Sequence, residues 1–242
     1  MDKLRLRFEK TGRAVYISHL DLMATMQRAF SRAGLELKYS EGFNPHPLIS
    51  ILLPLSVGTA SLCELMDFRL RETSDSRVTP ELLRELPARL TAALPEGIRV
   101  LEAYPTERKS AQLKWLDVEG RLEYDHGAPD TAALADFFAQ GEIVIEKKTK
   151  RGLGMADIRP AVQTISFAPE GAGSSGNWWE QKIPGPAEPE VILLKARISA
   201  QEPTLNPDHL IAALNQLRPE LAPDFAEFTR LETWDAGGEL YR

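Results

Sequence analysis

Strict alternation of apolar and charged residues opens the chain. In residues 3–8 (KLRLRF) every second residue is apolar and the residues between them are Lys or Arg, which is the period of a strand with one buried face. Apolar residues then recur at helical spacing over residues 22–33, and Gly34 follows, so a helix is expected to end there. Thr79-Pro80 predicts the start of a second helix, because Thr is a good N-cap and Pro suits the first helical position.

The remaining pattern predicts two halves with the same order of elements. The first half is expected to hold strands at 3–8 and 14–17, a helix at 18–33, strands at 35–39, 48–53 and 63–71, a helix from 79 to about 95 and a strand at 98–104. The second is expected to hold a strand at 111–124, a helix at 131–139, a strand at 142–148, a short element at 160–167, a strand at 190–200, a helix at 206–217 and a strand at 228–234.

When the first two strands are taken as one hairpin, the first half has the β-α-β-β-α-β order of the split βαβ motif. We therefore expect an α+β fold of two tandem ferredoxin-like (βαββαβ) modules. The first covers residues 1–107, and the second covers 108–242 and includes a basic loop and a flexible insertion at 169–189. The insertion is inferred from its Gly, Pro and Ser content.

Composition narrows the class of protein. The chain has 242 residues, of which 43% are hydrophobic and 26% charged, as in ordinary globular proteins. Its single cysteine, Cys63, excludes an internal disulfide and an iron–sulfur cluster held by thiolates of this chain alone. The apolar stretches are too short to span a membrane. We expect a soluble cytoplasmic protein with no cofactor and no metal.

Charge is distributed unevenly along the chain. The formal net charge is −6, but residues 1–50 and residues 146–159 each carry +3. Two basic patches on an acidic body favour contact with a polyanion at particular places rather than everywhere. An ordinary random distribution of charged residues explains the same counts. The charge counts alone therefore do not distinguish the two explanations, and the motifs are needed.

Two histidines in the first half are candidates for chemistry. His19 lies in the first turn of the expected helix at 18–33, where free N–H groups attract anions, although Ser18 and Asp21 also suit a simple cap. His46 lies in the loop at 39–47 (YSEGFNPHP), which has a stiff backbone and also offers Tyr39, Phe43 and Asn44. Phe43 there is either a core residue or a stacking platform. If His19 and His46 meet, they form a two-histidine pocket that can serve as acid and base.

Two groups of cations are candidates for phosphate contacts. Lys147, Lys148, Lys150 and Arg151 leave a strand and enter a glycine-bearing loop, which can follow a phosphate backbone or be a solvated strand end. Arg5 and Arg7, together with Lys3, are expected on the sheet face that the helices leave open. The first strand lacks the aromatics with which RNA-recognition modules stack bases on that face.

Several motifs together resemble a known family. They are YISHLDL at 16–22, Arg28-Ala29, Arg32-Ala33-Gly34, the loop at 39–47, Pro54-Leu55, Val57-Gly58, KKTKRG at 147–152 and DIRP at 157–160. In these the chain resembles the radical SAM-linked bacterial domain family of unknown function, whose members occur fused to or encoded beside B12-binding radical SAM proteins. The resemblance implies a role linked to modification of RNA or of the ribosome.

The leading hypothesis is an accessory protein that binds RNA (tRNA or rRNA) for a radical SAM partner and is not itself the catalyst. Arg5, Arg7 and the lysine-rich loop would contact phosphates, and His19, Tyr39, Phe43, Asn44 and His46 would hold a base or a chain end. The alternatives are an RNA-processing or small-molecule enzyme that uses His19 and His46, and a protein-interaction scaffold without RNA. The leading hypothesis expects these stretches to converge in one electropositive hollow.

Overall fold

The structure is a computed structural model that describes residues 3–71, 78–149, 152–170 and 189–242. The chain divides into two compact units, the first formed by residues 1–114 and 229–242 and the second by 115–228. The division at Lys114 lies near the expected boundary at 107/108, but the last fourteen residues group with the first unit. Both units are mixed α/β, and the described residues contain four α-helices.

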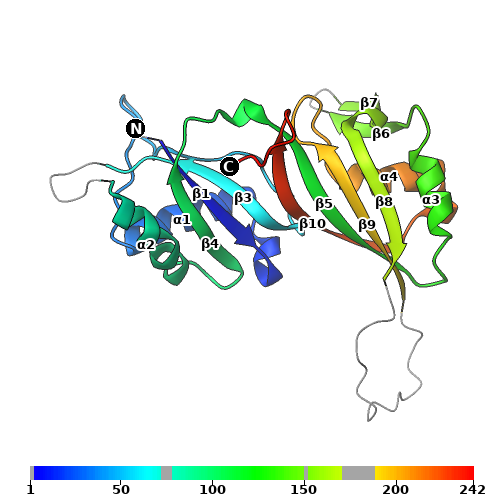
Figure 1. Cartoon of the computed structure of the whole chain (residues 1–242), viewed down its shortest axis with the longest axis horizontal. Coiled ribbons are helices and arrows are strands. Elements are labelled where there is room, and N and C mark those ends of the chain that lie inside the picture. The colour runs from blue at the N-terminus through cyan, green and yellow to red at the C-terminus, as the bar shows by residue number, and fades with distance from the viewer. Residues whose placement is uncertain (1–2, 72–77, 150–151, 171–188) are drawn as a thin grey trace, which may run out of the picture. The chain divides into compact units, whose positions relative to one another are not determined.

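The first unit places two helices on one face of a mixed sheet (Figure 1). Its elements are β1 (Leu4–Lys10), α1 (His19–Arg32), β2 (Ile49–Ile51), β3 (Ala60–Phe68), α2 (Pro80–Ala92), β4 (Ile98–Pro105) and the part of β10 (Phe225–Asp235) from Thr229 onward. The strand order is β4-β1-β3, with β2 also on β3, and all these pairs are antiparallel. β10 pairs in parallel with the start of β3 through Thr229 and Arg230.

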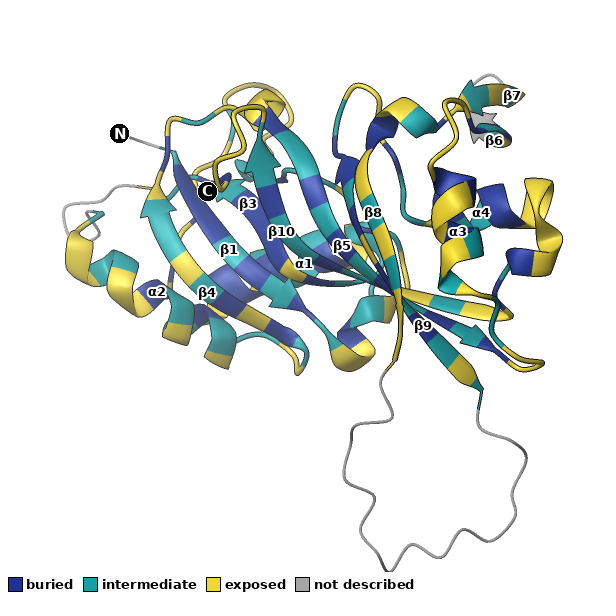
Figure 2. Cartoon of the chain, turned by 45° about the vertical axis from the view of Figure 1, so that its right-hand side comes forward, coloured by how far each residue is buried: buried dark blue, intermediate teal, exposed yellow. Residues whose placement is uncertain are grey.

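The helices cover the apolar face of β1, as the alternation predicts. Leu6 and Phe8 are fully buried against Met26 and Phe30 of α1 and Leu86 of α2, and the buried colour follows this layer in Figure 2. The caps agree with the sequence. Ser18 accepts from the Asp21 N–H at the start of α1, and Thr79 accepts from the Leu82 N–H at the start of α2.

The predicted hairpin at the start of the chain is wrong. Residues Gly12–Tyr16 form a short 3-10 helix instead of a strand. One local and one long-range bond bend the segment: Lys10 Nζ donates to the Val15 carbonyl at 2.9 Å, and Thr11 N–H donates at 2.7 Å to the carbonyl of Gly97, which is distant in sequence. Gly97 has a φ of +88°, and a Cβ there would lie 2.4 Å from the Thr11 oxygen. The predicted strand at 35–39 is reduced to isolated bridges, Leu37 to Leu70 and Tyr39 to Pro47.

The second unit has an antiparallel sheet and a separate hairpin. Its elements are β5 (Leu113–Tyr124), α3 (Thr131–Phe138), β6 (Val144–Thr149), β7 (Gly152–Asp157), β8 (Val162–Pro169), β9 (Glu190–Ser199), α4 (Asp208–Leu217) and the start of β10. β9 pairs with β5 on one side and β8 on the other. In the part of the chain that the structure describes, β6 and β7 form a two-stranded sheet of their own, so residues 152–157 form a strand where a loop was expected.

Candidate functional site

Arg5 is not a surface residue, which corrects the expectation for the first strand. Its side chain is fully buried, and its Nε lies 2.6 Å from Asp67 Oδ1. Its Nη2 donates to the Arg108 carbonyl at 3.0 Å, and its guanidinium lies 5.0 Å from the centre of the Tyr241 ring. Because residues near the C-terminus cover this side of β1, Arg5 cannot contact RNA.

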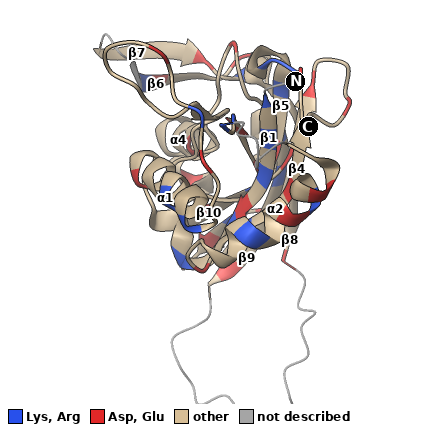
Figure 3. Cartoon of the chain, turned by 90° about the vertical axis from the view of Figure 1, so that its left-hand side faces the viewer, with Lys and Arg blue, Asp and Glu red and all other residues tan. Residues whose placement is uncertain are grey.

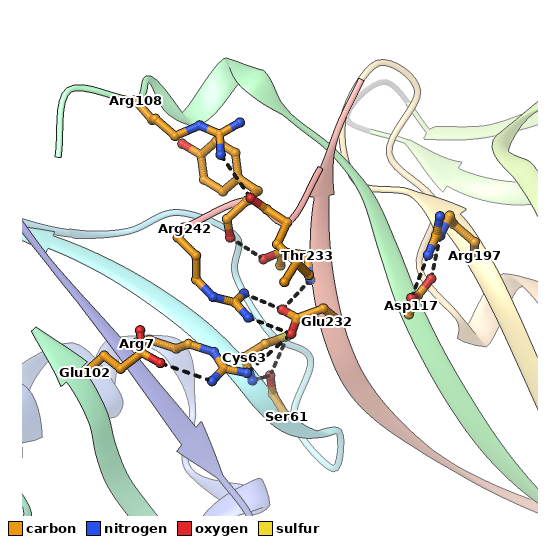
Figure 4. Close-up of polar contacts among 12 residues, drawn as sticks. Arg7, Ser61, Cys63, Glu102, Arg108, Asp117, Arg197, Glu232, Thr233 and Arg242 are labelled. Atoms are coloured by element: carbon orange, nitrogen blue, oxygen red, sulfur yellow. Dashed lines mark hydrogen bonds and ion pairs between the residues drawn. The ribbon is translucent and has the colours of Figure 1, made fainter. Parts of the chain in front are cut away.

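Arg7 is also held by acids of the first unit (Figure 4). Its Nη2 lies 3.4 Å from Glu232 Oε2 and its Nη1 lies 3.8 Å from Glu102 Oε1. Arg242 donates two hydrogen bonds to the same Glu232, from Nη1 to Oε1 at 2.5 Å and from Nη2 to Oε2 at 2.8 Å. Burial raises the pKa of Glu232, but hydrogen bonds from Arg242 and the Thr233 N–H outweigh it and hold the pKa below its ordinary value. The expected open basic face on β1 is therefore wrong, since β10 brings acids to it.

His19 is the first residue of α1 and is half-buried. Beside it, the Ser18 hydroxyl donates to Asp21 Oδ2 at 2.7 Å and accepts the Asp21 N–H, so these two residues serve as a cap. One cavity of the first unit, of about 910 Å³, includes Tyr39, and another, of about 330 Å³, includes His46, but neither includes His19. These cavities give no support to a shared two-histidine pocket.

The loop from Tyr39 to Pro47 is closed at its base. The Ser40 N–H donates to the His46 carbonyl at 2.9 Å, and the His46 N–H donates to Ser40 Oγ at 3.1 Å. Ser40 Oγ also lies 2.9 Å from His46 Nδ1. The Ser40 hydroxyl can donate to Nδ1 or accept from it, according to the tautomer of the imidazole. Asn44 is exposed on the loop, and Phe43 is fully exposed, so it is not a core residue.

A basic groove lies beside this loop, on the outer side of α1. We use the name for two cavities that share Arg28, of about 910 and 600 Å³. The basic residues that line them are Arg28, Arg32, Lys38, Arg71 and Arg89, and Glu36 is the one acid among the described lining residues. Tyr39, the first residue of the loop, also lines the larger cavity. In Figure 3 the Lys and Arg positions along α1 and α2 are blue on the ribbon.

The five cations of the groove differ in how firmly they are held. Arg32 Nη2 donates to the Ala93 carbonyl at 2.5 Å, and Arg89 Nη2 donates to the Ala33 carbonyl at 2.6 Å. Each arginine thus caps the C-terminal end of the other's helix, a favourable place for a cation. Arg71 forms an exposed ion pair with Glu36 at 3.4 Å, which is worth little in water. Arg28 and Lys38 are exposed, so their charges face solvent and any bound anion.

The lysine-rich segment of the second unit begins within β6. Lys147 is half-buried opposite Gly154 of β7, and its neighbour Glu146 exchanges hydrogen bonds with the Gln216 side chain of α4 at 2.8 and 2.9 Å. The side chain of Lys148 and the whole of Lys150 and Arg151 lie outside the described residues. The phosphate role proposed for these four residues stays a prediction.

Cys63 is unsuited to nucleophilic chemistry. It is buried in β3, and burial, with a contribution from the Glu64 carboxylate, raises the pKa of its thiol to about 12. We expect it to resist iodoacetamide at mildly alkaline pH in the folded protein, because the thiolate fraction there is about a thousandfold below that of an ordinary thiol. Mass spectrometry should show no adduct in buffer and full labelling in denaturant. Rapid labelling of the folded chain would contradict this.

The described part of the chain has neither a metal-binding cluster nor a membrane-spanning helix. No group of three or more His, Cys, Asp or Glu residues there is arranged to hold a metal ion. None of its helices has the length and hydropathy needed to cross a membrane.

Sequence reasoning missed most of the groove. Arg28 and Arg32 are four residues apart and therefore share one helix face, which was a readable signal. Lys38, Arg71 and Arg89 come from separate segments and join the groove only when α1, α2 and β3 pack. No local pattern marks them.

The fold and this groove define a mixed α/β protein with a basic, aromatic-edged cleft on one of its two units. The chain belongs to a bacterial family described as "Uncharacterized protein conserved in bacteria (DUF2344)", whose profile matches residues 3–207. A search of curated proteins found no match.

Proposed function

We propose that this protein binds RNA through the basic groove and acts in the cytoplasm as an accessory to an RNA-modifying enzyme. The observation that carries the proposal is the charge of the groove, where five Lys or Arg side chains meet one acid among the described lining residues. Cations clustered along a cleft are the electrostatic footprint of phosphate binding. The exposed Tyr39 at the edge of the cleft adds a flat surface for a base.

The charge of the two units supports the same place of binding. The first unit contains nineteen Lys or Arg against seventeen acids, and the second contains ten against eighteen. Several cations of the first unit, such as Arg5 and Arg7, are neutralised within the fold. From these counts the net charge of the first unit is +2 and that of the second −8, so a polyanion is attracted more strongly to the unit that carries the groove.

The finer parts of the proposal concern the modules and the partner. We propose that both units are ferredoxin-like modules. The β-α-β-β-α-β order of the first unit and its antiparallel strand order β4-β1-β3-β2 support this. We further propose a radical SAM protein as the partner, from the resemblance of the N-terminal motifs. Because the chain has one cysteine, the partner would have to supply the iron–sulfur cluster.

Binding of bulk tRNA and of rRNA fragments over a salt series tests the proposal. Each phosphate contacted releases condensed counterions, so the logarithm of the affinity should fall linearly with the logarithm of salt concentration, by roughly 0.7 to 0.9 per contact. Four or five contacts predict a slope of about −3 to −4.5. An affinity that does not change with salt, or no binding at low salt, would refute the proposal. Co-purification with a radical SAM protein of the native host tests the partner separately.

A further inference from the structure

The loop beyond the groove holds an aromatic ring away from the protein. Phe43 is as exposed as a free residue, at 107% of its reference area. The loop that carries it is closed by three Ser40–His46 interactions and by the Tyr39–Pro47 bridge. Exposing a large apolar side chain forgoes the free energy of burying it. A ring kept exposed by a closed loop is therefore available to a ligand.

The side chains around this ring suit a nucleobase better than a phosphate. Residues 39–47 contain no Lys or Arg, and Glu41, Asn44 and His46 are all exposed there. A carboxylate accepts from the amino groups of bases, and an amide both donates and accepts, whereas Glu41 would repel a phosphate. Tyr39, the first residue of this loop, lines the larger cavity of the groove together with the cations Lys38 and Arg71. The loop that carries Phe43 therefore begins at the basic groove.

We propose that an unpaired base of a bound RNA stacks on Phe43 while the adjoining phosphates lie in the basic groove. The ligand class is therefore RNA with exposed bases, such as a loop, a bulge or a single-stranded end, rather than a continuous duplex. Paired bases are stacked within the helix and offer no free face to a protruding ring. This inference rests on the proposed function and specifies the RNA that the same groove would take.

An exposed ring can also be a contact for a protein partner, which is the alternative explanation for Phe43. Protein docking sites are contiguous apolar patches, but the described neighbours of Phe43 in its loop are mostly polar or glycine. A base needs only one flat face and a few polar groups at its edge. The surroundings of Phe43 therefore favour a base.

The test compares two RNAs on the full chain. One is a short oligoadenylate with an internal 2-aminopurine, whose fluorescence is quenched by stacking, and the other is a blunt RNA duplex. Phe43→Ala should weaken oligoadenylate binding about tenfold and reduce the quenching, within the range for one aromatic–base stack. Binding of the duplex should not change. Phe43→Trp should preserve both signals, and Tyr16→Ala, which removes another exposed aromatic ring of the first unit, is the matched control.

The outcomes separate this inference from the function on which it rests. If Phe43→Ala binds oligoadenylate like the unaltered chain while binding remains salt-dependent, stacking is refuted and the groove stands. Equal losses for both RNAs, or losses with Tyr16→Ala, also refute it. Loss of radical SAM partner capture with Phe43→Ala, without loss of RNA, would assign the ring to a protein contact. If the unaltered chain binds neither RNA, the proposed function itself fails.

Discussion

Replacing Asp67 with alanine should lower the free energy of unfolding by about 3–5 kcal/mol, the usual result of removing one partner of a buried ion pair. Asp67 faces the fully buried Arg5, with Nε to Oδ1 at 2.6 Å and Nη2 to Oδ2 at 3.1 Å. Without it, the Arg5 guanidinium keeps the Arg108 carbonyl and the Tyr241 ring but no counter-charge among the contacts described. Because Arg5 Nη1 already lacks a hydrogen-bond partner in the described structure, little remains to offset the loss.

Urea denaturation of the variant, followed by circular dichroism, measures this effect. Glu81→Ala is the matched control, since its ion pair with Arg84 at 2.8 Å has both side chains about two-thirds exposed. Exposed pairs contribute roughly 0–1 kcal/mol, so the control should unfold almost like the unaltered chain. The double variant Arg5→Leu with Asp67→Leu should recover much of the lost stability, because it leaves no buried charge. Similar losses for Asp67→Ala and Glu81→Ala would contradict this account.

Reversing the charge of Arg28 and Lys38 should give the largest loss of RNA binding. Both side chains are exposed, and Arg28 lines both cavities of the groove. If each contacts one phosphate, Arg28→Glu with Lys38→Glu should make the salt slope shallower by about two, since each phosphate contact contributes about one. We expect the affinity at moderate salt to fall by at least two orders of magnitude, because two contacts are lost and two repulsive charges are gained. Filter binding over a salt series measures both quantities.

The control for this double variant must change the net charge equally elsewhere. Arg84→Glu with Lys195→Glu does so, at two exposed cations outside the groove with side-chain exposures of 74% and 66%. It should leave the slope unchanged and alter the affinity only slightly. A control that weakens binding as much as the groove variant would show that the overall charge, rather than the groove, attracts RNA.

Local patterns were sufficient for most elements of the fold. Helical spacing and the Ser18 and Thr79 caps located α1 and α2, and the alternation in residues 3–8 located β1 and its buried face. They failed where a distant segment decides the backbone. Residues 12–16 form a 3-10 helix because Thr11 is tied to Gly97, far away in sequence, and a pattern read in a short window contains no such partner.

For the candidate site, the sequence by itself determined that residues 39–47 form a stiff loop with an aromatic and that the single cysteine cannot hold a cluster. It determined which residues carry charge but not which charges remain free. Only the tertiary structure decided which charges remain free. A guanidinium can bind a ligand when no acid or carbonyl of the protein pairs with it, and its neighbours are set by folding. β10 and the C-terminal tail bring Glu232 and Tyr241 to Arg7 and Arg5, and the packing of α1 leaves Arg28 and Lys38 exposed at the groove. These neighbours are distant along the chain and meet only on folding.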